Sequence, residues 1–171
     1  MGSNRGSDAT TGRVLVVADW TADPEAIVAA CFARQEGSGD DFALLVPARL
    51  HGLDWVGDPA ASLPCAYRQL ATLAHLADSV DFAFHAARVG DPDPVAAICD
   101  ALDEWPAAEV LLCTRRRRAA VSHPLDLAHR IRRTTGLPVS PVRLGATTAR
   151  RGHTWVPFHT GHCALDLLNP G

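Results

Sequence analysis

The sequence predicts an α/β domain built on a five-stranded parallel sheet with helices on both faces. Three observations lead to this fold class. Short, continuous apolar runs recur along the chain, as is typical of strands buried on both faces of a parallel sheet. Segments with helical apolar spacing separate these runs. Two of these segments begin with Asp-Pro, a capping residue followed by proline in the first turn. Such alternation is the signature of a doubly wound, Rossmann-like arrangement.

The first part of the chain is predicted to form a strand, a helix and a second strand. Residues 13–18 are an apolar run rich in valine, and Asp23-Pro24 then begins a helix. The apolar stripe of this helix consists of Ile27, Val28, Cys31 and Phe32. Two glycines within residues 36–40 predict a turn, and residues 42–46 form the second strand.

The middle of the chain repeats this pattern after an irregular stretch at residues 47–63. A second helix is predicted over residues 64–77 and a third strand over residues 80–87. The inward face of that helix is expected to consist of Tyr67, Leu70, Leu73 and Ala77. Asp93-Pro94 repeats the signal for a helix start. The stripe of this third helix consists of Val95, Ile98, Cys99 and Leu102.

The last predicted elements are a strand, a helix and a final strand. Residues 110–113 form the fourth strand, and a helix then runs from near Pro124 to Gly136. Its inward residues are Leu127, Ala128 and Ile131. Residues 137–144 form the fifth strand. Because Pro141 has no N–H to donate to a neighbouring strand, we expect the fifth strand at an edge of the sheet.

Length and composition predict one soluble domain. We divide the 171 residues into a flexible leader (1–12), the α/β domain (13–144) and a C-terminal extension (145–171). A net charge of -3 gives no overall attraction to nucleic acid. No apolar stretch approaches the length of a membrane span, and no hydrophobic signal core precedes the domain, so we expect a cytoplasmic protein. The five cysteines are widely spaced, which favours reduced thiols.

The segment after the fourth strand has an unusual composition. No glycine occurs in residues 91–135, although nucleotide-binding folds normally place there a glycine loop whose backbone N–H groups hold phosphate. Thr114 and four arginines at 115–118 occupy this position instead. Guanidinium groups bind phosphate bidentately, so the arginines indicate either an anion site or a solvated loop. All 16 basic residues are arginine, which excludes lysine-dependent chemistry.

The order of segments from about residue 12 to about residue 144 resembles the universal stress protein family. The similar pieces are the first strand ending in Asp19, the turn Gly90-Asp91-Pro92 before a helix, and the helix at 126–133 followed by Gly136-Leu137-Pro138-Val139. The resemblance implies the adenine nucleotide alpha hydrolase-like sheet and a homodimer, commonly formed through the last strand. It also implies, in many members, ATP bound at the carboxyl ends of the first and fourth strands.

The sequence departs from the ATP motif of that family, which has the form G-x2-G-x9-G-[ST]. The equivalent span opens with Cys113-Thr114 and ends near Asp126, and all three glycines are missing. A carboxylate at Asp126 would repel the phosphate that the family's Ser or Thr contacts. Trp20 places a ring large enough to fill an adenine pocket next to Asp19. The chain therefore resembles the ATP-free branch, and we expect no cofactor, with ATP or another adenine nucleotide as the alternative.

Candidate binding residues follow from the fold and the resemblance. They are Asp19, Val46, Thr114, Arg115, Arg116 and Asp126. By resemblance, Asp19 would bond a ribose or a neighbouring backbone group, and it is equally suited to closing the first strand–helix turn. Val46 would border adenine in an ATP-binding relative, and is otherwise a core residue.

We predict no catalytic or metal residues. Ser122-His123 with Asp126 lacks the elbow that exposes a nucleophile. His159 and His162 beside Cys163 lack a second pair of zinc ligands. The resemblance implies a regulatory or stress-response binding module, with a nucleotide or anion sensor using Asp19 and the Thr114–Arg118 loop as the alternative. We expect binding rather than catalysis, a homodimer, and neither DNA nor membrane as partner.

Overall fold

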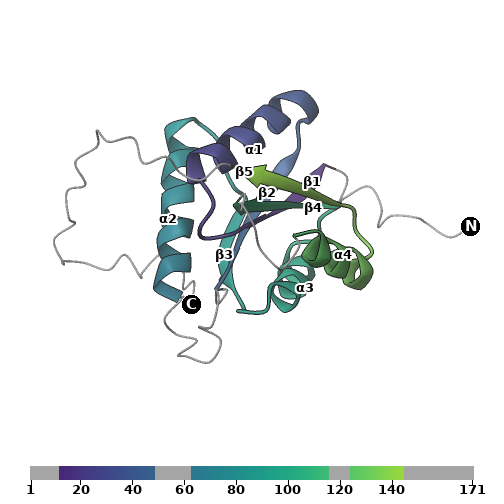
Figure 1. The fold of residues 1–171 in the computed structure, drawn as a ribbon. Coiled ribbons are helices and arrows are strands. Elements are labelled where there is room, and N and C mark those ends of the chain that lie inside the picture. Colours follow the sequence, from purple (N-terminus) through teal and green to yellow (C-terminus); the bar gives the residue numbers. More distant parts are fainter. Residues whose placement is uncertain (1–11, 49–62, 116–123, 145–171) are drawn as a thin grey trace, which may run out of the picture.

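Five parallel strands and four helices make up the described part of the chain in the computed structural model (Figure 1). The structure describes residues 12–48, 63–115 and 124–144. The elements in chain order are β1 Arg13–Ala18, α1 Pro24–Ser38, β2 Asp41–Pro47, α2 Leu63–Ser79, β3 Ala86–Gly90, α3 Pro94–Glu104, β4 Glu109–Arg115, α4 Pro124–Thr135 and β5 Val139–Leu144. The predicted α/β fold class is confirmed.

The strands are ordered β3-β2-β1-β4-β5, and every neighbouring pair is parallel. This order places β5 at an edge of the sheet, as Pro141 predicted, because an edge strand can lack a donor on its outer side. The chain first builds outward from β1 to β3 and then returns to the other side of β1. Strand order therefore reverses between β1 and β4, the position where open α/β sheets bind ligands.

The core has two layers, one on each face of the sheet. Helices α1 and α2 cover one face, where buried side chains such as Val16, Cys31 and Phe42 pack. Helices α3 and α4 cover the other face around Leu15 and Ile131 (Figure 1). Burial on both faces explains why β1 is an uninterrupted apolar run.

The predicted helix starts at Asp23 and Asp93 and the helix end at Gly136 are confirmed, whereas α1 continues through residues 36–38, which were predicted as part of a turn, and ends before Gly39. The Asp23 carboxylate accepts a hydrogen bond from the Glu25 N–H at 3.2 Å, and the Asp93 carboxylate accepts one from the Val95 N–H at 3.0 Å. Each satisfies a backbone donor that the first helical turn leaves unpaired. Gly136 ends α4 in the left-handed conformation, with φ 72°.

The third strand was placed wrongly from the sequence. It spans Ala86–Gly90 rather than residues 80–87. The apolar residues before it form a turn, in which Asp81 has φ 55° and Phe82 is fully buried. The Phe82 ring lies 5.5 Å from the Phe42 ring and 4.9 Å from the Phe84 ring, between centroids. These aromatic contacts anchor the loop to the core. In the sequence, the alternating aromatic residues of this loop resemble those of a strand.

The inward face of α2 also differs from the prediction at one position. Tyr67 is 54% exposed, whereas Gln69 is buried. The Gln69 Nε2 donates a hydrogen bond to the Ala22 carbonyl oxygen at 3.0 Å, which satisfies both buried groups. The helix is thus rotated so that an amide, rather than the phenol ring, supports the loop between β1 and α1.

Candidate functional site

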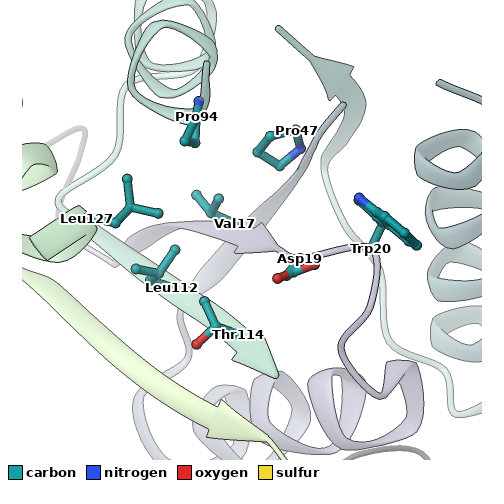
Figure 2. A pocket seen from close by; sticks show the side chains of 8 residues that line it. All are labelled: Val17, Asp19, Trp20, Pro47, Pro94, Leu112, Thr114 and Leu127. Carbon is teal, nitrogen blue, oxygen red and sulfur yellow. The ribbon is translucent and has the colours of Figure 1, made fainter. Parts of the chain in front are cut away.

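A small pocket lies at the carboxyl ends of β1 and β4, where the strand order reverses (Figure 2). Its described lining consists of Val17, Asp19, Trp20, Pro47, Pro94, Leu112, Thr114 and Leu127. The enclosed space measures about 20 Å³, close to what one water molecule needs. Two of the lining side chains, Asp19 and Thr114, carry oxygen atoms, whereas the remaining walls are largely apolar.

Asp19 shapes the turn between β1 and α1. Its N–H donates to the Cys113 carbonyl oxygen at 3.0 Å, which extends the contact between β1 and β4. Its Oδ1 atom accepts hydrogen bonds from the Thr21 N–H and the Thr21 hydroxyl, each at 2.9 Å. This is an Asx turn, so Asp19 has a structural role in addition to its place in the pocket wall.

Trp20 borders the pocket beside Asp19. Its half-buried ring packs against the core layer under α1 and α2, and Figure 2 shows it at the margin of the site. The ring that we predicted to fill an adenine pocket is thus one of the residues lining this small pocket.

Thr114 contributes the most distinctive polar atom of the site. It lies near the end of β4, pairs in register with Arg143, and is 9% exposed. Its Oγ1 atom is buried and has no hydrogen-bond partner among the described residues. A buried hydroxyl left without a partner costs about 1–3 kcal/mol. Thr114 is therefore a polar residue of the pocket wall whose hydroxyl makes no hydrogen bond to the described residues.

The other candidate residues are placed differently. Val46 is fully buried in the core layer under α1 and α2, and does not belong to the described pocket lining. Arg115 ends β4 and Asp126 lies in the first turn of α4, but the side chains of both are outside the described part, as is all of Arg116. The arginine run, the Ser122-His123 pair and the histidines of the C-terminal extension likewise fall mainly or wholly outside it.

Sequence reasoning missed the proline and leucine walls of the pocket. Pro47 ends β2, Pro94 begins α3, and Leu127 lies in the first turn of α4. Each directly follows or precedes a loop at the same edge of the sheet. The sequence did place these residues near strand and helix ends, and the carboxyl ends of parallel strands meet at one edge of the sheet. It does not show which side chains at that edge point into the pocket.

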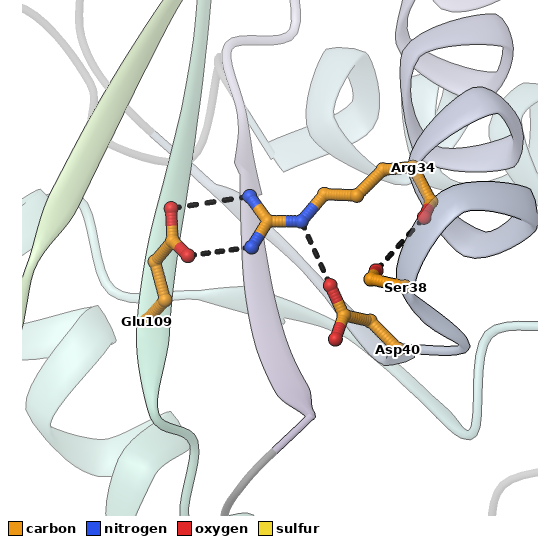
Figure 3. Close-up of polar contacts among 4 residues, drawn as sticks. All are labelled: Arg34, Ser38, Asp40 and Glu109. Carbon is orange, nitrogen blue, oxygen red and sulfur yellow. Dashed lines mark hydrogen bonds and ion pairs between the residues drawn. The ribbon is translucent and has the colours of Figure 1, made fainter.

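A charged cluster at the opposite end of the sheet joins α1, the loop before β2, and β4 (Figure 3). Arg34 of α1 donates from its two terminal nitrogens to the Glu109 carboxylate, at 3.1 and 2.6 Å. Its Nε donates to Asp40 Oδ2 at 2.9 Å. The hydrogen bond from Arg34 lowers the pKa of Glu109, against the opposing effect of burial. Because these groups are mutually paired, we interpret the cluster as structural.

The buried thiols are not poised for reaction. Burial raises the pKa of the Cys31 thiol to about 12. Burial also raises the pKa of the Cys113 thiol, and the nearby Cys31 adds a smaller effect in the same direction. A thiol held protonated is a poor nucleophile and metal ligand. Within the described ranges, no group of His, Cys, Asp and Glu is arranged to hold a metal ion. In the same ranges, no helix combines the length and apolarity that crossing a membrane requires.

Comparison with solved structures identifies the fold. A universal stress protein family member from Burkholderia pseudomallei superposes with a TM-score of 0.56 at 15% identity, covering 78% of this chain and 97% of its own. The chain has the universal stress protein fold. The universal stress protein from Archaeoglobus fulgidus gives a TM-score of 0.51 at 15% identity, covering 77% of this chain and 93% of its own. A universal stress protein solved in complex with cAMP gives a TM-score of 0.52 at 15% identity, covering 77% of this chain and 95% of its own.

The similarity is confined to structure. No family model matches the sequence, and no curated protein matches it. The universal stress protein fold predicted from segment order is thus confirmed by the coordinates.

Proposed function

We propose that this protein is a regulatory or stress-response binding module of the universal stress protein type that does not hold ATP by a glycine loop. The proposal assigns ligand binding to the pocket between β1 and β4. It excludes the usual phosphate cradle because residues 91–135 contain no glycine. Side chains, rather than main-chain N–H groups, would contact the ligand.

The observation that carries this proposal is the Thr114 hydroxyl. It is buried in the pocket wall without a described partner, so its hydrogen bond can be made by something that enters the pocket. The carboxylate of Asp19 borders the same small space. A carboxylate accepts hydrogen bonds from ligand hydroxyl or amine groups, whereas it disfavours a phosphate at close range.

The second candidate function is a nucleotide or anion sensor that uses Asp19 and the Thr114–Arg118 loop. The same unpartnered hydroxyl favours it, since a hydroxyl can donate to a phosphate oxygen. One structural neighbour was solved in complex with cAMP, which supports testing that ligand. The arginines that follow Thr114 would supply the positive charge.

Isothermal titration calorimetry with ATP, cAMP and inorganic phosphate separates the two functions. If the protein is a binding module that does not hold ATP by a glycine loop, no ATP binding is expected at micromolar concentrations. A micromolar affinity for ATP would refute this proposal. The sensor predicts binding of cAMP or phosphate that weakens at least about tenfold in Thr114→Val, as expected for a lost hydrogen bond to a charged group. Thr114→Ser is the matched control, because it keeps the hydroxyl and should keep the affinity.

We further propose a homodimer acting in the cytoplasm through binding rather than catalysis. The dimer follows from the family resemblance and from β5 lying at a sheet edge. Light scattering during size-exclusion chromatography should give twice the chain mass of 18.2 kDa. A monomer at micromolar concentration would contradict the dimer, and nucleotide hydrolysis above background would contradict the absence of catalysis.

A further inference from the structure

A second hollow lies between α1 and α2, on the face of the sheet away from α3 and α4. Its volume is about 410 Å³, within the range of ligand and side-chain binding pockets. The lining residues are Glu25, Val28, Ala29, Phe32, Leu76, Ser79 and Val80. We call this hollow the α1–α2 groove. Val80 is 45% exposed, and Phe32 and Leu76 are only partly buried, so the groove leaves apolar surface uncovered in the described structure.

The described chain ends on the same face as this groove. Leu144, the last residue of β5, is 7% exposed and belongs to the core layer under α1 and α2. Val28 belongs to that layer too, and Phe32 and Leu76 pack against it. The chain beyond Leu144 therefore starts from the edge strand β5, at a residue whose side chain packs on the face that carries the groove.

The sequence after Leu144 contains one short segment with two large aromatic residues three positions apart. Residues 145–171 lie outside the described part, and Trp155-Val156-Pro157-Phe158 begins 11 residues after Leu144. Eleven extended residues span up to about 40 Å. The whole of α2 has 17 residues, a length of about 25 Å. The aromatic segment can therefore reach any part of the groove.

Charge at the groove matches the residues next to this segment. Glu25 is exposed among the lining residues of the groove. Arg150 and Arg151 precede Trp155 by only a few positions. A basic pair beside an aromatic anchor complements an apolar groove with a carboxylate among its lining residues.

We propose that residues 155–158 bind in the α1–α2 groove of their own chain. Trp155 and Phe158 supply the two large apolar side chains, each of which buries about 150–250 Å² when fully covered. The extension thus acts as an intramolecular cover for a surface that would otherwise stay exposed to solvent.

Residues 49–62, which also lie outside the described ranges, are less suited to the groove because they contain one large aromatic residue, Trp55, rather than two. Residues 49–62 join α2 at Leu63, whereas the groove involves Leu76 and Val80 at the opposite end of that helix. A second copy of the chain is a further candidate occupant, and the experiment below distinguishes these three.

Photo-crosslinking in the full-length chain tests the proposal. The photoreactive residue p-benzoylphenylalanine replaces Ala29, which is exposed and lines the groove. Trypsin then places position 29 on peptide 14–34 and the aromatic segment on peptide 152–171, because neither Lys nor Arg follows Arg151. We expect these two peptides to be joined within one chain. The matched control replaces Asp100, which is exposed on α3 on the other face, and should not give this product.

Mixing isotopically light and heavy protein separates the outcomes. A light–heavy product would show that a second copy fills the groove, and a product with peptide 50–68 would assign it to residues 49–62. Either result, or no product with peptide 152–171, overturns the proposal. The double variant Trp155→Ala/Phe158→Ala should lower the yield of the product at least about tenfold, since it removes both large apolar side chains that would fill the groove. Circular dichroism checks that each variant is folded.

Discussion

Gly90 allows α3 to pack directly on the sheet, and Gly90→Ala should destabilise the domain. A Cβ atom built at position 90 lies 2.7 Å from the Ala97 Cβ and 2.8 Å from the Leu45 Cδ1. Carbon atoms prefer separations of about 3.5–4.0 Å. Ala97 is 1% exposed and Leu45 is fully buried. Neither can yield without moving α3 or the core layer beneath it.

The size of the loss follows from two opposing effects. Inserting a methyl group into a packed site costs about 1–3 kcal/mol. Replacing glycine by alanine also restricts the unfolded chain, which returns about 0.4–1 kcal/mol. We therefore expect a net loss of about 1–2 kcal/mol in the free energy of unfolding, or about 3–8 °C in Tm for a domain of this size.

Urea unfolding followed by circular dichroism measures this difference. Gly37→Ala is the matched control, because Gly37 lies within α1 and a Cβ there meets no atom within 4 Å. This control should gain up to about 1 kcal/mol, since glycine is a poor helix former. The two variants make the same chemical change and are expected to act with opposite sign. A Gly90→Ala protein as stable as the parent would refute the close approach of α3.

Three further predictions concern the charged cluster, the pocket and the thiols. Glu109→Gln should lose about 1–2 kcal/mol at pH 7, because it breaks a partly buried bidentate pair with Arg34. The folded-state pKa of Glu109 is lowered, so its contribution is present above pH 4.5 and is lost as the pH falls through the folded pKa. Urea unfolding at pH 7 and pH 3 should show a smaller deficit at the lower pH, and an equal deficit at both would contradict the assignment. Thr114→Val should keep or raise stability by up to about 1 kcal/mol, since it removes an unpaired hydroxyl; a clear loss in thermal melts would reveal a partner. Iodoacetamide should label Cys31 and Cys113 at least about tenfold more slowly in the folded than in the urea-unfolded protein, as expected for buried, protonated thiols, and equal rates by mass spectrometry would contradict their burial.

The sequence alone determined the order of elements and several of their boundaries. Asp23 and Asp93 each predict a helix start because their carboxylates accept a hydrogen bond from an N–H only two residues away. Pro141 predicts an edge strand because the missing N–H is a property of that residue itself. The sequence also named Asp19 and Thr114 as candidates for the site. These inferences depend on chemistry within a few residues of the chain, so no distant contact is needed to make them.

Only the tertiary structure decided where β3 begins, which side of α2 faces inward and which side chains surround the pocket. Alternating aromatic residues suit a strand as well as a loop fixed to the core, and Phe82 belongs to the loop because its ring packs on Phe42. Gln69 turns inward because the Ala22 carbonyl oxygen lies within its reach. Pro47 and Thr114 line one pocket although 66 positions separate them in the chain. Such choices depend on contacts between segments far apart in sequence, and those contacts exist only once the sheet and its helices have packed together.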